Sequence, residues 1–236
     1  MKYFLLTILI TLLSVVYLPG LHYKYLRNMV SSAVVRITDE TGEHGGTGFH
    51  VKAASGKSYI VTNAHVCELR NKKQFIYVGR NPDRVVKRKV LEVSKVSDLC
   101  LIESLKDMGS LSVASSVNFG EIVAVVGHPS LMGVTMTRGE LIDESEVLVY
   151  DHDLDLEDEN DCKLPKNEIV DNGFFGQACM ISISAYRSNV VLQPGNSGSP
   201  LINFYGNVVG VAFAGGRNGW GIFVTLEDIN KFLSIY

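Results

Sequence analysis

One short segment of the chain holds a candidate nucleophile in a turn. The heptapeptide PGNSGSP, residues 194–200, places Ser197 between Gly195 and Gly198. Glycine allows a positive φ and a close approach of the backbone to a ligand, so successive amides in such a turn can converge on one anion. A serine between glycines is either an ordinary loop residue or a nucleophile beside an oxyanion site, and its partners decide between the two.

His65 is the histidine best placed to act as a general base for that serine. A serine hydroxyl needs such a base at neutral pH, and histidine, with an ordinary pKa of about 6.5, is the usual one. The segment SYIVTNAH, residues 58–65, predicts an apolar strand that ends in a polar turn and delivers the imidazole of His65 to the rim of a barrel. The other histidines lie beside the N-terminal apolar run, in a glycine-rich turn, in an expected strand, in a loop and in an acidic run: His22, His44, His50, His128 and His152.

Asp98 supplies a carboxylate that can hold this imidazole. It opens the segment DLCLI, residues 98–102, where one charge precedes an apolar strand. A buried carboxylate fixes the tautomer of a catalytic histidine and stabilises the imidazolium. Taken alone, Asp98 is typical of a turn or a helix cap. The combination predicts a triad for nucleophilic hydrolysis: His65, Asp98 and Ser197 follow one another in this order, with separations of 33 and 99 residues.

The elements that must position this triad are short strands. From Ala33 onward, β-branched runs are broken by Gly, Asn, Asp and Ser, with hardly a stretch of helical period before the end of the chain. A chain of 236 residues with 46% hydrophobic content can bury two small cores in one globular unit. The expected strands are residues 33–38, 46–51, 58–62, 74–78, 85–93, 99–103, 121–127, 134–142, 177–184, 199–202, 208–214 and 221–225.

These strands predict an all-β fold of two six-stranded antiparallel barrels. Six strands lie on each side of a looser segment, residues 106–119, which is typical of two barrels joined by a linker. We expect a catalytic unit of residues 28–236, with barrel one at about residues 30–108 and barrel two at about residues 118–236. Residues 226–236 predict a closing amphipathic helix.

The sequence resembles the trypsin-like (chymotrypsin-fold) serine proteases, and within them most closely the high-temperature-requirement (HtrA/Deg) and glutamyl-endopeptidase-like branches. The resemblance rests on five ordered blocks spread over nearly the whole chain after the N-terminal region. Each block alone is a weak signal, whereas five blocks at compatible spacing make chance agreement improbable. The blocks are GTGF at 46–49, VTNAHV at 61–66, DLCLI at 98–102, VAVVGHP at 123–129 and PGNSGSP at 194–200.

The resemblance implies a serine endopeptidase that acts on polypeptides with His65, Asp98 and Ser197 in a cleft between the barrels. It places the oxyanion hole on the backbone N–H groups of Gly195 and Ser197, and it implies no metal ion and no organic cofactor. The alternative function is a catalytically inactive member of the same fold that binds peptides at the edge of the cleft. No PDZ domain is expected beyond the catalytic unit.

The resemblance also implies a substrate pocket beside the triad. No acidic residue stands at its expected base, so we expect a small or medium apolar residue before the cut bond. One position departs from the family pattern, because Phe213 stands where many members carry a small polar residue that braces the triad aspartate. The pocket would be walled by Val191, Leu192, Ala212, Phe213, Ala214, Gly215 and Gly221.

The N-terminal region predicts a signal anchor or a signal peptide. Lys2 precedes an apolar run, residues 3–18, which as a helix would reach about 24 Å against a hydrocarbon core of about 30 Å. A small-residue cleavage site is missing near its end, which favours an uncleaved anchor. Basic residues flank the run on both sides, so charge does not fix its orientation. We expect residues 1–27 to comprise this segment and a juxtamembrane stretch, and the protease domain to be membrane-anchored or exported.

The net charge of −3 conceals a strongly acidic segment. Residues 143–161 hold ten acidic and no basic residues, so the remainder of the chain carries +7. The basic residues of segment 70–95 alternate with apolar ones and have no aromatic stacking platform, so nucleic acid is not an expected partner. An EF-hand loop that starts at Asp151 is not expected, because Leu156 occupies the position that needs Gly and Cys162 the position that needs Glu. We therefore expect a solvated, mobile acidic loop, with a substrate-selecting or cation-binding flap as the alternative.

The four cysteines allow three pairings, and the sequence does not choose among them. In an exported chain, Cys162 and Cys179 could form a disulfide at the end of the acidic segment. Cys67 and Cys100 each stand two residues after a triad residue, so their sulfurs come near each other if His65 and Asp98 meet. Buried free thiols fit this second pair equally well. The oligomeric state is not predicted.

Overall fold

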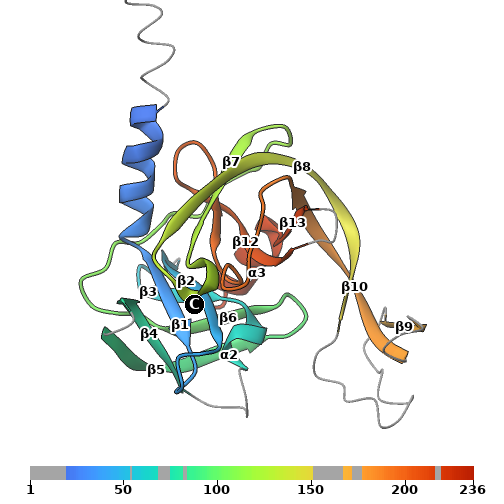
Figure 1. Ribbon diagram of the computed structural model, residues 1–236, viewed down its shortest axis with the longest axis horizontal. Helices are drawn as coiled ribbons and strands as arrows, with labels where there is room; N and C mark the ends of the chain where they lie inside the picture. The colour runs from blue at the N-terminus through green and yellow to red at the C-terminus, as the bar shows by residue number, and fades with distance from the viewer. Residues whose placement is uncertain are drawn as a thin grey trace, which may run out of the picture.

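The computed structural model consists of two antiparallel β-barrels with a helix at residues 20–31 standing beside them (Figure 1). It describes residues 20–53, 55–68, 75–81, 84–150, 167–171, 177–215 and 219–236. The predicted anchor, residues 3–18, lies outside these ranges. Within them, no helix has the length and apolar character needed to cross a membrane.

Barrel one is a closed barrel of six strands in the order β1-β2-β3-β6-β5-β4. Two of its strands are almost wholly buried: β1 has the sequence VVRIT with every residue buried, and β6 has the sequence LCLIE with four buried residues. A short helix, α2 (Ala64–Cys67), follows β3. The strands are β1 (Val34–Thr38), β2 (Gly45–Lys52), β3 (Ser58–Thr62), β4 (Phe75–Asn81), β5 (Arg84–Ser94) and β6 (Leu99–Glu103).

Barrel two contains the remaining strands, in the order β13-β12-β11-β7-β8-β10, and is closed by pairing of β10 with β13. β9 adds to β10 outside this ring. A 3-10 helix, η1 (Pro129–Leu131), precedes β8, and α3 (Leu226–Leu233) ends the chain, with the Thr225 hydroxyl capping the amide of Asp228. The strands are β7 (Ile122–Gly127), β8 (Thr135–Tyr150), β9 (Asn167–Asp171), β10 (Gln177–Ser188), β11 (Pro200–Ile202), β12 (Val208–Gly215) and β13 (Gly221–Val224).

The predicted all-β fold of two six-stranded barrels with a C-terminal helix is therefore confirmed, with corrections to some strand bounds. Three strands run several residues further than predicted: β4 continues from residue 78 to Asn81, β8 from residue 142 to Tyr150, and β10 from residue 184 to Ser188. Strand β9 was not predicted at all. Residues 143–150 of the acidic segment belong to β8, while the loop predicted for residues 151–161 lies outside the described part of the chain.

Polar pairs across the hairpin explain why the start of the acidic segment forms a strand. Asp143 is held by Arg187, whose Nε donates to its Oδ1 at 2.7 Å, and this bond lowers the pKa of the Asp143 carboxyl. The hydroxyls of Ser184 and Ser182 donate to Glu144 and Glu146 at 2.7 and 2.6 Å. Such cross-strand pairs stabilise an antiparallel ladder, so each of these carboxylates has a donor facing it.

One of the three clusters of buried apolar side chains in the described residues spans both barrels. It includes Phe49 and Leu101 from barrel one, Ile202 from barrel two and Phe232 from α3. The linker is bound to both barrels, because the amide of Leu111 donates to His50 O and the amide of Ala114 donates to Val208 O. The two barrels are thus joined by both apolar packing and backbone hydrogen bonds.

Candidate active site

The described chain brings His65 and Asp98 into direct contact at two points. The Asp98 carboxylate accepts a hydrogen bond from the His65 backbone amide at 3.0 Å through Oδ1, and its Oδ2 lies 2.8 Å from the ring Nδ1. An ionised carboxylate can only accept, so the proton of the neutral imidazole sits on Nδ1 and Nε2 is left as an acceptor. The arrangement therefore fixes both the orientation and the tautomer of the ring.

The register of barrel one explains this contact. β3 and β6 pair with Thr62 opposite Cys100, so the residues after β3 and the residues before β6 meet at the same end of the sheet. Asn63, fully buried, donates from its side chain to Asp98 O at 3.0 Å. Asp98 itself has a positive φ of 47°, a conformation that aspartate and asparagine adopt more readily than most residues.

A disulfide joins the same two segments. Cys67 of α2 and Cys100 of β6 are bonded, and both side chains are buried. The hypothesis that their sulfurs come together is therefore supported, and the alternative of free thiols is wrong for this pair. The other predicted pair includes Cys162, which lies outside the described residues.

The turn that carries Ser197 depends on glycine at two positions. Gly195 and Gly198 have φ values of 91° and 81°, which are open to glycine at little cost. A Cβ on Gly198 would overlap Thr47 O and Thr62 Oγ1, both in barrel one. The turn is closed by three backbone bonds: Asn196 N to Gln193 O, Ser199 N to Asn196 O and Gly198 N to Ala212 O.

Two amides in this turn have no acceptor in the part of the chain that the structure describes. They belong to Gly195 and Ser197, the residues predicted to form the oxyanion hole. Unpaired backbone N–H groups of a serine and of the residue two positions before it can bind an anion that forms next to the serine hydroxyl.

Thr47 of barrel one connects this turn to its surroundings. Its amide donates to Ser197 O at 2.7 Å, and its hydroxyl donates to Gly195 O at 2.8 Å while accepting from the amide of His128 at 2.9 Å. The Thr47 side chain is fully buried. One residue of barrel one thus holds the carbonyls of both amide-bearing residues of the turn in barrel two.

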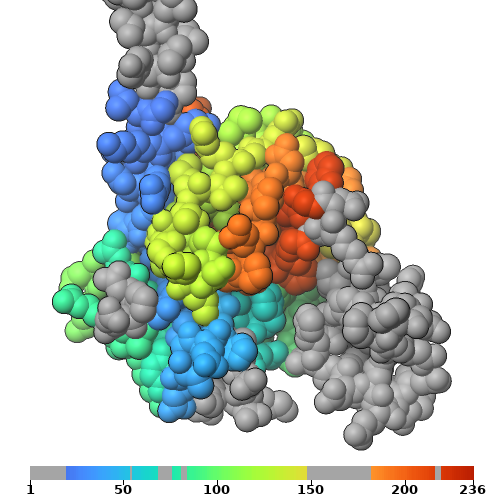
Figure 2. Space-filling model, in the orientation of Figure 1, coloured from blue at the N-terminus to red at the C-terminus, as the bar shows by residue number. Residues whose placement is uncertain are grey.

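The segment around η1 supports the other side of the turn. The amide of Ser130 donates to Pro194 O at 2.6 Å, and a Cβ on Gly195 would lie 2.9 Å from the amide nitrogen of Leu131. Ser130 and Leu131 have positive φ values of 52° and 57°. In Figure 2 the yellow-green surface of the segment that includes η1 adjoins the orange surface of the segment that precedes β11.

Within the described residues, no hydrogen bond joins Ser197 to His65, although their surroundings are shared. A Cβ on Gly46 would lie 2.6 Å from Ser197 O and 2.8 Å from the side chain of Val66, the residue after His65. The ring of Phe213, next to the Ala212 carbonyl that binds the turn, lies edge-on 6.2 Å from the His65 ring. Catalytic hydrogen bonds are often long in free enzymes and shorten in the substrate complex.

The other described histidines lack a carboxylate hydrogen-bonded to their rings. His50 and His128 are almost completely buried, and burial lowers the pKa of His50 to about 4. Burial and the nearby Arg36 guanidinium lower the pKa of His128, against the opposing effect of its bond to Met132 O. Both rings are therefore neutral near pH 7. His22 stacks on Phe204 at 3.9 Å.

The residues predicted for the substrate pocket lie along two neighbouring strands and the segment that leads to the turn. Gly215 pairs with Gly221 across β12 and β13, and a Cβ on Gly215 would contact Leu192 at 3.9 Å. Val191 is 57% exposed, so its side chain does not wall a closed pocket. Ala212 is buried, Ala214 pairs with Ile222, and Phe213 packs towards His65.

Among the described residues, no three His, Cys, Asp or Glu side chains gather as metal ligands would.

A comparison with known protein families shows to which family a chain with this fold and site belongs. The family model for the trypsin-like peptidase domain matches residues 46–211. The chain belongs to the trypsin-like peptidase family. Within this trypsin-like domain lie both His65 with Asp98 and the turn of Ser197.

Relatives of the trypsin-like domain include bacterial proteases of the HtrA type. The chain is 28% identical over 172 residues to the serine protease Do-like HtrA of Lactococcus lactis and 25% identical over 179 residues to that of Bacillus subtilis. These alignments cover 70% and 74% of the chain but only 36% and 34% of the two relatives. The chain thus matches about a third of their length.

Solved structures confirm the fold of the trypsin-like domain. The Rv3671c protease from M. tuberculosis, in its active form, superposes with a TM-score of 0.66, covering 92% of this chain and 86% of that chain at 20% identity. The same protease in an inactive form superposes with a TM-score of 0.68 at 21% identity.

Sequence reasoning missed several residues that hold the site together. Thr47 was noticed only as part of a matching block, His128 only as a loop histidine within such a block, and Asn63 only as part of the turn before His65. The signal was present in the positions of these blocks, because each lies at the end of a strand that borders the cleft. The bonds that give these residues their roles join segments 81 and 148 residues apart, which a strand pattern does not reveal.

Proposed function

We propose that this chain is a serine endopeptidase in which Ser197 is the nucleophile, His65 the general base and Asp98 the group that orients it. The observation that carries the proposal is the double contact of the Asp98 carboxylate with the amide and the ring of His65. A second support is the pair of unbonded amides at Gly195 and Ser197, which suits a developing oxyanion. Family membership favours the same activity.

The mechanism follows from these roles. Ser197 Oγ attacks the carbonyl carbon of the substrate while its proton moves to His65 Nε2, and the resulting oxyanion accepts bonds from the Gly195 and Ser197 amides. Collapse breaks the C–N bond as His65 protonates the leaving amine. A water molecule then gives a proton to His65 and attacks the acyl ester, and the serine oxygen leaves with that proton. Asp98 stays ionised throughout and stabilises the imidazolium.

The proposed substrate is a polypeptide with a small or medium apolar residue before the cut bond. Support comes from the apolar and glycine residues at the predicted pocket, above all Leu192 beside Gly215 and the buried Ala212. The edge-on ring of Phe213 beside His65 places a further apolar surface next to the triad. A pocket of this kind contains no carboxylate to pair with an Arg or Lys side chain.

We also propose that the enzyme works outside the cytoplasm, either anchored through residues 3–18 or exported. The apolar run in the sequence supports this location, and so does the Cys67–Cys100 disulfide, because disulfides form and persist in oxidising compartments. The bond ties α2 to β6, so it links the two segments that carry His65 and Asp98.

Labelling with a fluorophosphonate probe tests the proposed activity. The probe should attach once per folded chain, with loss of fluoride, and peptide mapping by mass spectrometry should place the adduct on Ser197. Denaturation before labelling should abolish the reaction, because an isolated serine is a weak nucleophile. A folded chain that takes up no probe would instead favour the inactive peptide-binding alternative.

Thr47→Val should lower kcat by about 100-fold, because the oxyanion turn loses the hydroxyl that holds Gly195 O and binds the amide of His128. Valine keeps the shape of threonine but leaves both buried groups unpaired, so the free energy of unfolding should fall by about 1–3 kcal/mol. Steady-state kinetics and thermal unfolding measure the two effects.

Thr47→Ser is the matched control, since it keeps the hydroxyl and should retain kcat within a few-fold. If Thr47→Val lowered stability but left kcat and KM unchanged, Thr47 would be a structural residue without influence on the reaction. A loss confined to kcat identifies it as a positioning residue for the oxyanion turn.

A further inference from the structure

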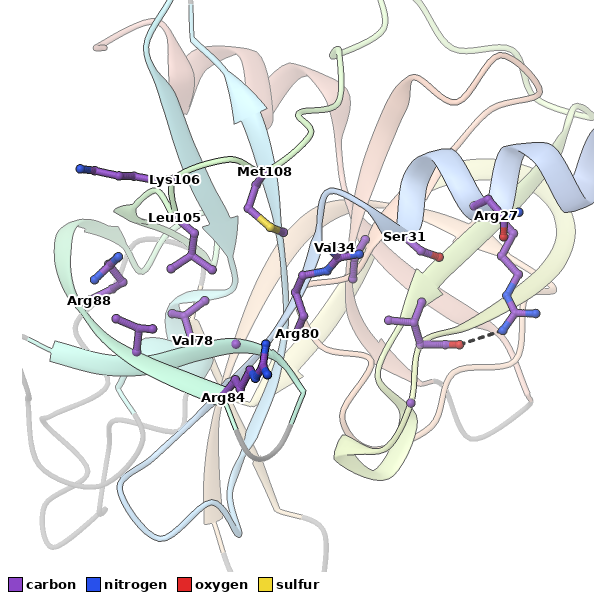
Figure 3. Close-up of a pocket in the computed structure, with 15 residues that line it drawn as sticks. Arg27, Ser31, Val34, Val78, Arg80, Arg84, Arg88, Leu105, Lys106 and Met108 are labelled. Atoms are coloured by element: carbon purple, nitrogen blue, oxygen red, sulfur yellow. Dashed lines mark hydrogen bonds between the residues drawn. The ribbon is translucent and has the colours of Figure 1, made fainter.

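A groove of about 940 Å³ on barrel one concentrates positive charge. It lies between the helix at residues 20–31, strands β4 and β5, the segment after β6 and the segment before β8 (Figure 3). Five of its lining side chains are cationic, namely Arg27, Arg80, Arg84, Arg88 and Lys106, and none of its fifteen lining residues is acidic. The charge of this groove therefore differs sharply from the chain as a whole, which carries −3.

None of these cations is neutralised by a carboxylate within the described part of the chain. Arg27 donates to the backbone carbonyl of Val134 at 3.2 Å, and Arg88 donates to the carbonyls of Ser104 and Lys87. Arg80 and Arg84 flank the β4–β5 turn and are exposed. Like charges gathered in a concave surface repel one another and raise the local concentration of anions, so the groove is suited to an anionic ligand.

The arrangement of the cations requires several anionic groups in one ligand. Arg88 and Lys106 lie at one end of the groove in Figure 3, Arg80 and Arg84 in its middle, and Arg27 on the helix at the other end. A single phosphate or carboxylate cannot meet all of them. Between the cations, the groove is lined by aliphatic side chains that include Val34, Val78 and Leu105. The ligand must therefore alternate negative charges with apolar groups.

An acidic polypeptide has this alternation, whereas a nucleic acid does not. The fifteen lining residues include no aromatic side chain on which a base could stack. Arginine, which supplies four of the five cations, matches a carboxylate with two parallel hydrogen bonds. The sequence of this chain contains a segment of the required chemistry: residues 151–161, DHDLDLEDEND, in which Leu154 and Leu156 alternate with the acidic residues at 153, 155 and 157.

We propose that the groove is a binding site for an acidic polypeptide segment in which carboxylates alternate with aliphatic residues. The groove shares no residue with the proposed triad, so peptide binding there does not depend on whether the chain hydrolyses peptides. Binding there would join two copies of this chain, because the groove of one copy would hold the acidic segment, residues 151–161, of the other.

Fluorescence anisotropy of a labelled synthetic peptide with the sequence of residues 151–161 tests the proposal on the full chain. The peptide should bind, and its affinity should fall as salt rises from about 50 to 300 mM, because exposed ion pairs are screened. The double variant Arg80→Ser/Arg84→Ser should weaken binding by about tenfold or more. Mass spectrometry of the recovered peptide shows that it was not cleaved during the measurement.

The double variant Lys52→Ser/Lys57→Ser is the matched control, because it removes the same charge from exposed positions on the β2–β3 hairpin, outside the groove. It should bind the peptide as the unchanged chain does. Equal weakening by both double variants, or equal affinity for a peptide with Asn and Gln in place of Asp and Glu, would overturn the proposal. Tighter binding of an oligonucleotide or of anionic phospholipid vesicles, weakened by the same arginine variant, would overturn the assignment to a polypeptide.

Discussion

Ser197→Ala lowers kcat for peptide hydrolysis by about a million-fold, the loss expected when the nucleophile of a triad is removed. The remaining rate reflects substrate binding and the amides of Gly195 and Ser197, which the substitution leaves in place. Alanine requires no change in backbone at this position, so the thermal unfolding temperature should stay within a few degrees. Initial rates with an apolar fluorogenic peptide substrate measure the effect.

Ser110→Ala is the control for this variant. Ser110 is an exposed serine in the linker between the barrels, away from the turn, and its loss should leave kcat unchanged. A Ser197→Ala chain that folds and still hydrolyses peptides within tenfold of the original rate would show that another group is the nucleophile.

Asp98→Asn should lower kcat by about 10,000-fold with little change in KM. Asparagine has the same shape and tolerates the positive φ of this position, so the backbone contact to His65 N can persist. The group that faces the ring Nδ1, however, becomes an amide that can donate. The imidazole then favours the opposite tautomer, in which Nε2 carries the proton and cannot accept one from Ser197.

Asp107→Asn provides the matched control, because Asp107 also has a positive φ, of 59°, and is exposed in the linker. Its kinetics should equal those of the unchanged chain. If Asp98→Asn kept a tenth or more of the original kcat, the contact between Asp98 and His65 would have no catalytic role.

The fold was predictable because most strands are short apolar runs bounded by turn residues. The predicted bounds of β3 and β6 match the observed ones, because polar residues flank both SYIVT and LCLIE. β8 was predicted too short because Asp143, Glu144 and Glu146 look like loop residues in isolation. Their donors on β10 lie 36 to 44 residues away, and no local pattern reveals that pairing.

The sequence predicted which residues form the candidate site, from their types and the order of the motifs, but not the bonds that hold them in place. His65 and Asp98 were expected to meet, and the register of β3 with β6 explains why they do. The bond between Cys67 and Cys100 was left open, because a disulfide and two buried thiols occupy similar space in a core. The bonds from Thr47 to the turn of Ser197 were missed, because they depend on how the two barrels pack against each other and not on the local sequence of either segment.

Ser197, the proposed nucleophile, belongs to barrel two in the sequence, but its backbone is held by contacts with Gly46 and Thr47 of barrel one. The carbonyl of Ser197 is bonded to an amide of barrel one, and Gly198 fits against Thr47 and Thr62 with no room for a side chain. We expect the turn of Ser197 to keep this conformation only while the two barrels stay packed together, so that a small relative displacement would disturb the proposed site without unfolding either barrel. An inhibitor that binds at the proposed site only when the barrels are packed together would also stabilise that packing, because a ligand stabilises the state to which it binds.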